Sequence, residues 1–190
     1  TFVQITDIHL DADHVLEFNE VISELNEIAP DFVIATGDLI SEGNTGTIAE
    51  AEECFSLYRD AIAQLDMPVF NAVGNHDVVG IKSKAVAETE PGYGEGVYTD
   101  LFGPTYYSFD WGDYHCIVLD PNDLVDGEQV YQISEVQMKW LEEDLTNRSE
   151  SPLLVFYHEP TPTWRNRSEF SDSLGEHRVQ AFCGHWHQDI

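Results

Sequence analysis

Basic side chains are scarce in this sequence. Its 190 residues hold 36 Asp and Glu against 8 Lys and Arg, three of them lysines, which gives a formal net charge of -28. A long nucleic acid needs matching positive charges for its phosphates, so we expect none as a partner. Disorder is also disfavoured, because 12% of the residues are aromatic and 42% are hydrophobic. A self-repelling folded chain needs screening, and in ~1 M salt the Debye length falls to about 3 Å, which points to a high-salt environment.

Cysteine and long apolar runs are scarce too. Cys54, Cys116 and Cys183 have no spacing typical of zinc or redox sites, and we expect Cys116 and Cys183 to be reduced core residues. No apolar run approaches the ~20 residues that span a bilayer. The compartment stays open, with the cytoplasm favoured over other locations.

The length predicts one domain over residues 1–190, since such a chain can bury one sizeable core. The first residue already lies in an expected strand, and the last lies three residues past the final histidine. We therefore expect this sequence to be a piece of a longer chain.

Five short apolar runs, rich in β-branched and aromatic residues, are each followed by residues that can bind a metal. The runs are residues 2–6, 32–36, 69–73, 153–157 and 179–183. The residues that follow them are Asp7 and His9, then Asp38, then Asn75, then His158, then His185 and His187. In open α/β sheets, ligands collect at the carboxyl ends of the strands. The order predicts one composite metal site on a rigid sheet.

The segments between these runs complete an α/β pattern. Residues 15–28 and roughly 47–65 have helical spacing and would cross from one parallel strand to the next. Residues 106–110 and 114–120 flank a tight turn and predict a hairpin, and Ser134 opens a further helix. Residues 81–96 are typical of a long exposed loop.

The spelling of the polar blocks adds a resemblance. The blocks are Asp7-Ile8-His9, Gly37-Asp38, Gly74-Asn75-His76-Asp77, His158 and Gly184-His185-Trp186-His187. In this order they resemble the calcineurin-like metallophosphoesterase superfamily, and the set is similar to its cyclic-nucleotide phosphodiesterase and purple acid phosphatase branches. The resemblance implies an α/β four-layer sandwich, with two mixed β-sheets flanked by helices and with C-terminal strands missing from this sequence.

The resemblance also implies a set of roles. Asp38 would bridge two metal ions, Asp7, His9 and His187 would complete one shell, and Asn75, His158 and His185 would complete the other. His76 would be the catalytic histidine, and a hydroxide between the metals would be the nucleophile. Nitrogen and oxygen ligands suit manganese, iron or zinc.

Two groups near these blocks have alternative interpretations. Asp77 would either orient His76 or hold it cationic, or else cap the following turn. Trp164, Arg165 and Arg167 follow the His158 block and could contact a phosphate, or else the arginines pair with the acidic surface.

Two departures from the superfamily pattern weaken a narrow substrate assignment. Glu159 follows His158 where the similar phosphodiesterases commonly have a second histidine, and Ser41 stands where purple acid phosphatases have a tyrosine. We therefore expect no iron-tyrosinate centre.

Three functions are compatible with these features. The first is a metal-dependent phosphoesterase that hydrolyses small phosphoric monoesters or diesters. The second is a DNA-processing nuclease of the same superfamily, which would need a basic groove that this charge does not favour. The third is a non-catalytic scaffold, which predicts missing ligands, whereas all seven candidates are present. The metal, the natural substrate and the oligomeric state stay open.

Overall fold

The computed structural model describes residues 1–83, 86–125, 127–146, 148 and 151–187. The strands are β1 (Phe2–Ile5), β2 (Phe32–Thr36), β3 (Val69–Ala72), β4 (Tyr107–Trp111), β5 (Tyr114–Val118), β6 (Asn122–Val125), β7 (Glu128–Tyr131), β8 (Leu153–Phe156) and β9 (Val179–Phe182). The helices are α1 (Val15–Ile28), α2 (Ile48–Ile62), α3 (Gly96–Phe102), α4 (Glu135–Leu145) and α5 (Arg167–Leu174), with a 3-10 turn at Thr161–Thr163.

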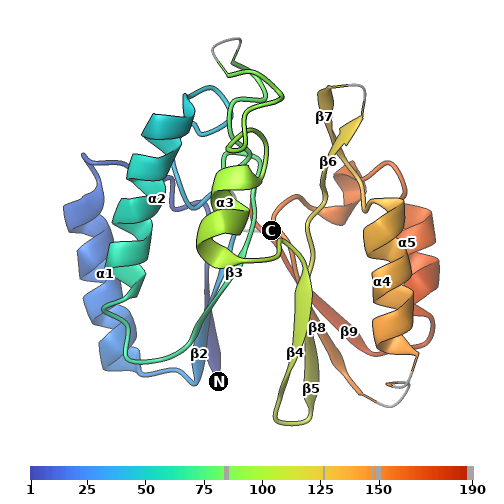
Figure 1. Ribbon diagram of the computed structural model, residues 1–190. Coiled ribbons are helices and arrows are strands. Elements are labelled where there is room, and N and C mark those ends of the chain that lie inside the picture. Colours follow the sequence, from blue (N-terminus) through green and yellow to red (C-terminus); the bar gives the residue numbers. More distant parts are fainter. Residues whose placement is uncertain (84–85, 126, 147, 149–150, 188–190) are drawn as a thin grey trace.

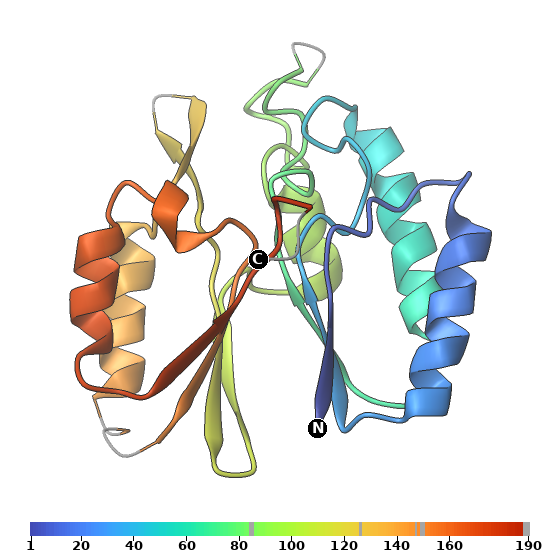
Figure 2. The same ribbon diagram turned by 180° about the vertical axis from the view of Figure 1, so that it is seen from behind.

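These elements form four layers. Helices α1, α2 and α3 lie against the outer side of the sheet β1-β2-β3, and α4 and α5 lie against the outer side of the sheet β4-β5-β8-β9 (Figure 1). The view from behind shows the two sheets between the helical layers (Figure 2). The predicted α/β sandwich of two sheets flanked by helices is confirmed.

Strand direction differs between the two sheets. The strands β1, β2 and β3 are parallel, because the crossover helices α1 and α2 return the chain to the same end each time. In the second sheet β4 and β5 form the predicted antiparallel hairpin, and β8 and β9 add to it in parallel. That sheet is mixed, whereas the three-stranded sheet is parallel throughout. A separate antiparallel hairpin, β6 with β7, was not predicted.

The two sheets are held together by aromatic side chains. We call this set the aromatic layer; its members are Phe2, Phe32, Phe70, Phe109, Trp111, Phe156 and Phe182. Phe2 stacks on Phe32 with ring centroids 5.2 Å apart, and Phe70 stacks on Phe109 at 3.8 Å. Offset and edge-on ring pairs of this kind stabilise a core beyond the area they bury. The aromatic layer therefore fixes where the strand ends of one sheet lie relative to the other.

Local sequence signals explain where two of the helices begin. Thr47 and Glu50 form a capping box at α2, and Ser134 accepts a hydrogen bond from the backbone N–H of Gln137 at α4. Ahead of α1, the Asp11 carboxylate accepts the backbone N–H groups of Asp13 and His14. Within the described residues, no helix has both the length and the apolar character needed to cross a membrane.

Candidate metal centre

The loops that follow β1, β2, β3, β8 and β9 converge at one edge, between the two sheets. Residues 183–187, which follow β9, lie beside the loop after β1 (Figure 2). Contacts confirm this proximity, because the backbone N–H of His185 donates to both carboxylate oxygens of Asp7, at 3.0 and 3.1 Å. The structure thus brings the first and last polar blocks of the sequence together.

Asp7, His9 and His187 form one group. Their potential ligand atoms all lie within 4.8 Å of one another. His187 Nε2 lies 3.3 Å from Asp7 Oδ1 and 3.3 Å from His9 Nε2. Two imidazole nitrogens and a carboxylate oxygen that face one point suit a first-row metal ion.

Asp38, His158 and His185 form a second, more buried group whose ligand atoms meet the same 4.8 Å limit. His158 Nε2 lies 3.0 Å from Asp38 Oδ2. Asn75 adjoins this group, because its Oδ1 lies 2.8 Å from His185 Nδ1. These are the four residues that the resemblance assigns to one shell.

Asp38 lies between the two groups. Its Oδ2 is 3.0 Å from His158 Nε2 and 3.7 Å from His9 Nε2. Its other oxygen, Oδ1, accepts the backbone N–H of His76 at 2.8 Å. A carboxylate in this place can contact both groups at once, so its position suits the bridging role.

His158 presents a buried ring nitrogen whose surroundings suit a cation. Its Nδ1 lies 2.7 Å from the carbonyl oxygen of Thr36, which can only accept, so Nδ1 carries the proton and a neutral ring keeps its lone pair on Nε2. That Nε2 is buried and has no hydrogen bond, although Asp38 is close enough for an ion pair. A buried polar atom without a partner calls for an explanation. A metal ion would supply the missing partner, and the bond to Thr36 would orient the ring for it.

The protonation states of the candidate histidines differ. Burial lowers the pKa of His158, but the Asp38 and Glu159 carboxylates outweigh burial and raise the pKa to about 9, so this ring carries a second proton at neutral pH that a metal ion would displace. Burial lowers the pKa of His9 and of His185, despite the nearby carboxylates, so both rings stay neutral at pH 7, as metal binding needs.

The backbone at this edge is strained. Five candidate ligands have positive φ, a rare conformation for residues other than glycine. They are Asp7 (52°), His9 (47°), Asp38 (51°), His185 (75°) and His187 (49°). Such conformations cost on the order of 1–3 kcal/mol each and gather at functional sites.

Two motif glycines allow the loops to approach each other. A Cβ at Gly74 would collide with the backbone N and Oδ1 of Asp38, and one at Gly184 would lie 2.5 Å from Asp7 Oδ2. Each glycine therefore lies against a candidate ligand from another loop, which explains why this residue opens these blocks.

His76 lies at the edge of both groups. Its ring meets that of His9 edge-on at 4.7 Å, and one of its ring nitrogens lies within 4.8 Å of ligand atoms of His9 and Asp38. Its Nδ1 is buried and has no hydrogen bond. The ring is near enough to the candidate ligands to act on a bound substrate.

Asp77 forms hydrogen bonds to the backbone of two loops. Its carboxylate accepts backbone N–H groups of Leu39 and Ile40 through Oδ1 and of Gly74 through Oδ2. Burial and the Asp38 charge raise the pKa of Asp77 to about 8. The hydrogen bonds of Asp77 tie together the loops after β2 and β3, which supports a structural role for this carboxylate, and its predicted action on His76 stays a prediction.

The three predicted substrate contacts differ in burial, and their contact with substrate stays a prediction. Trp164 is 3% exposed, packs on Tyr157 and Phe170, and donates its Nε1–H to the Glu159 carbonyl, so it is a core residue and not an exposed aromatic face. Arg165 and Arg167 are exposed. The Arg167 guanidinium donates to the Pro162 carbonyl at 3.4 Å, and no ion pair joins either arginine to a candidate ligand within the described residues.

Sequence reasoning missed Tyr131. Its ring centroid lies 5.5 Å from that of His185, with the rings at 78°. Tyr131 belongs to the unpredicted β6–β7 hairpin, and no local pattern in the sequence marks it as part of the site.

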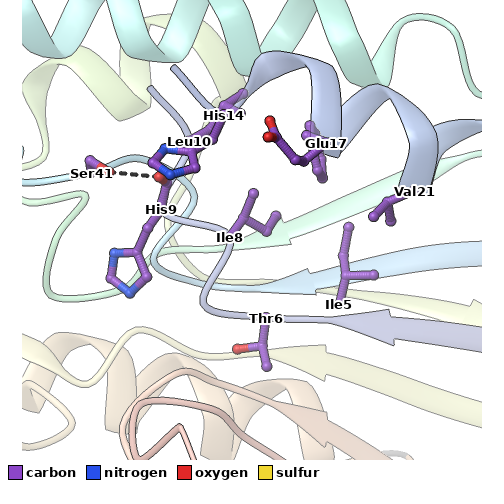
Figure 3. A pocket seen from close by; sticks show the side chains of 10 residues that line it. Ile5, Thr6, Ile8, His9, Leu10, His14, Glu17, Val21 and Ser41 are labelled. Carbon is purple, nitrogen blue, oxygen red and sulfur yellow. Dashed lines mark hydrogen bonds between the residues drawn. The ribbon is translucent and has the colours of Figure 1, made fainter. Parts of the chain in front are cut away.

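A cavity of about 480 Å³ lies beside the centre, between β1 and α1 (Figure 3). Its walls are mostly apolar and include Ile5, Ile8 and Val21. The His9 ring extends away from Val21, and the Ser41 hydroxyl donates to the His9 carbonyl at 2.6 Å (Figure 3). Ser41 thus holds the loop that carries His9.

Fold and site together define an α/β sandwich with a candidate two-metal centre at the carboxyl ends of its strands. A sequence model of calcineurin-like phosphoesterases matches residues 1–189, so the chain belongs to this family of metal-dependent phosphoesterases.

Individual relatives fit that assignment. A probable glycerophosphodiester phosphodiesterase of Arcobacter nitrofigilis is 23% identical over 98% of this chain and 71% of its own length. The 3',5'-cyclic adenosine monophosphate phosphodiesterase of Escherichia coli K12 is 26% identical over 99% of this chain and 70% of its own length. A crystal structure of a dimetal phosphatase from Danio rerio shares the fold, with a TM-score of 0.70, 15% identity, and coverage of 98% of this chain and 81% of that one.

Proposed function

We propose that this protein hydrolyses small phosphoric monoesters or diesters at a dinuclear metal centre. The observation that carries the proposal is the convergence of seven candidate ligands from five loops, with Asp38 between two groups of imidazoles and carboxylates. Asp7, His9 and His187 would hold one ion, and Asn75, His158 and His185 would hold the other. The unpartnered Nε2 of His158 and the nitrogen and oxygen donor set fit manganese, iron or zinc.

When bound, two such ions lower the pKa of a water molecule and neutralise charge on a phosphoryl group. The protein's part is to hold the substrate and to manage its protons. His76 is the group best placed for proton transfer, because its ring lies next to His9 and its backbone is fixed by the bond to Asp38. An imidazole there would protonate the departing alkoxide or stabilise its developing charge.

The surroundings favour a small substrate. Within the described residues, no Lys or Arg side chain pairs with a candidate ligand, and the chain carries a net charge of -28. A DNA strand would meet repulsion along the surface, whereas a single phosphoester would need only the metals and a few neutral donors. The same charge supports a protein adapted to high salt.

The test begins with the wild-type protein, purified in molar salt. Bound metal is measured per chain, and p-nitrophenyl phosphate is assayed beside bis(p-nitrophenyl) phosphate with added manganese. We expect two ions per chain and turnover of at least one ester, and the ratio of the two rates gives the preference for monoester or diester. A folded, metal-free and inactive protein would support the scaffold interpretation instead.

His76→Ala tests the proton-transfer role. Because His76 is not one of the seven proposed ligands, the metal content should stay at the wild-type level while kcat falls roughly 10²- to 10⁴-fold. His14→Ala is the matched control, since His14 is exposed and bonds to Asp11 outside the two ligand groups. Equal activity of His76→Ala and wild type would refute the role.

A further inference from the structure

The described residues of the β6–β7 hairpin supply no candidate ligand, yet the hairpin lies at the same end of the molecule as the candidate metal centre (Figure 1). Tyr131, the last residue of β7, brings its ring within 5.5 Å of the His185 ring. The two rings meet at 78°, an edge-on contact that fixes the direction of the phenol ring relative to the ligand. One residue of the hairpin thus borders the proposed site directly.

The hairpin is anchored to the segment that carries His158. Asn122 Nδ2 donates to Glu159 Oε2 at 3.2 Å, directly after that histidine. At the other strand, the Arg165 backbone N–H donates to the Tyr131 carbonyl at 2.9 Å. Both strands therefore have a fixed attachment, and Tyr131 is held in place as a preorganised binding group requires.

The phenol hydroxyl of Tyr131 has no hydrogen-bond partner among the described residues. Other tyrosines with buried phenols do have one: Tyr58 bonds to the Asn71 side chain, Tyr98 and Tyr107 bond to the Asn71 backbone, and Tyr157 bonds to Thr161. An ordinary phenol has a pKa of about 10, so this hydroxyl is a hydrogen-bond donor at neutral pH. A half-buried donor near the centre is left for an outside acceptor.

A bound phosphoryl group needs such a donor. Its oxygens carry negative charge, and no lysine or arginine side chain among the described residues reaches the candidate ligands. We propose that Tyr131 is a substrate-binding residue whose phenol donates a hydrogen bond to a non-bridging oxygen of the phosphoryl group. This inference rests on the proposed function, and it assigns the β6–β7 hairpin as one wall of the substrate site.

The test compares two Tyr→Phe variants. Tyr131→Phe keeps the ring against His185 and removes only the hydroxyl. Tyr114→Phe is the control, because Tyr114 is 44% exposed at the opposite end of the second sheet, beside the β4–β5 turn. For both variants and the wild type, bound metal, melting temperature, kcat, KM and the inhibition constant of inorganic phosphate are measured.

We expect Tyr131→Phe to keep its metal and its melting temperature while KM and the phosphate inhibition constant rise roughly tenfold, as for loss of a hydrogen bond to a charged group. The control should match the wild type in every measurement. A phosphate inhibition constant unchanged by Tyr131→Phe would overturn the inference, and so would a loss of metal that accounts for the whole effect. Failure of the proposed function would appear in the wild type itself. A wild-type protein that binds metal but neither hydrolyses the esters nor binds phosphate would overturn both proposals.

Discussion

Five strands of this protein carry two regions of opposite character. Their apolar residues form much of the aromatic layer, where Phe2 stacks on Phe32 and Phe156 stacks on Phe182. A few residues further on, β1, β2, β3, β8 and β9 end in the candidate metal centre. One region buries apolar rings in regular extended backbone, and the other gathers charges on strained loops. The middle of each strand therefore contributes mainly to stability, whereas its carboxyl end contributes to the candidate site.

The strain and the packing are connected. Positive φ at candidate ligands such as Asp7, Asp38 and His185 opposes folding, and so does the unpartnered Nε2 of His158. The aromatic layer offsets these costs because it holds the strand ends in place whatever their loops prefer. Substitutions at the strand ends should therefore change activity at nearly constant stability, and substitutions in the aromatic layer should do the reverse.

Asp38→Asn should give the largest effect. Asparagine keeps an acceptor for the backbone N–H of His76 but removes the negative charge between His9 and His158. We expect kcat/KM to fall roughly 10³-fold or more, with fewer metal ions bound per chain, because a bridging ligand contributes several kcal/mol. The metal-free protein should melt within a few degrees of the wild type. Wild-type turnover with two bound metals would contradict the bridging role.

Gly74→Ala should give the next largest effect. The new Cβ would collide with Asp38, so the loops after β2 and β3 must move apart, and a displacement of about 1 Å costs roughly 10²-fold in rate. Gly112→Ala is the control, because Gly112 has φ 60° at the β4–β5 turn and open space around its Cα. That variant should lose some stability and no activity. Equal kcat/KM for Gly74→Ala and the wild type would show that loop spacing does not matter.

The contrast between regular strands and converging loops also explains what the sequence could predict. Strands, crossover helices and capping residues follow from local periodicity, so the α/β architecture could be predicted. The seven candidate ligands could be proposed because each follows a strand, and their convergence is what the structure adds.

Long-range contacts account for the features that could not be predicted. The β6–β7 hairpin is attached through Asn122 to Glu159, 37 residues away, and no local pattern records that contact. The contacts of Trp164 and Asp77 could not be predicted either, because they depend on the tertiary structure. Trp164 is buried against Tyr157 and Phe170, and Asp77 accepts the backbone N–H of Leu39.

Phe32→Leu tests the other side of the comparison. Phe32 is 2% exposed, stacks on Phe2 and meets Phe70 and Phe109 edge-on. We expect the free energy of unfolding, measured with urea, to fall by roughly 1–3 kcal/mol. The value of kcat/KM per folded molecule should stay within about twofold of the wild type. A large loss of activity in fully folded protein would show that the aromatic layer and the candidate metal centre do not act independently.

Glu95→Gln should give the smallest effect on activity. It changes a pair of carboxyl groups, Glu95 and Asp120, at the same edge of the sheets. Asp120 follows β5, but its partner is the carboxyl group of Glu95, and neither belongs to a candidate metal group among the described residues. Burial, the Asp120 charge and the hydrogen bond between the two raise the pKa of Glu95 to about 9. The raised pKa keeps a proton on this carboxyl pair at neutral pH, whereas the candidate ligands nearby are arranged for a metal ion.

The sign of the pH effect follows from that raised pKa. The folded protein binds the Glu95 proton more tightly than the unfolded chain does, so its stabilisation is complete below about pH 4.5 and is lost as the pH rises through about 9. Glutamine keeps an N–H donor for Asp120 at every pH. Glu95→Gln should therefore melt like the wild type near pH 4.5 and become more stable than the wild type as the pH rises to about 9, by roughly 1 kcal/mol for each pH unit at most, with unchanged metal content. Parallel pH profiles for the two proteins would show that the pair does not share a proton, and a change in bound metal would join this pair to the metal centre.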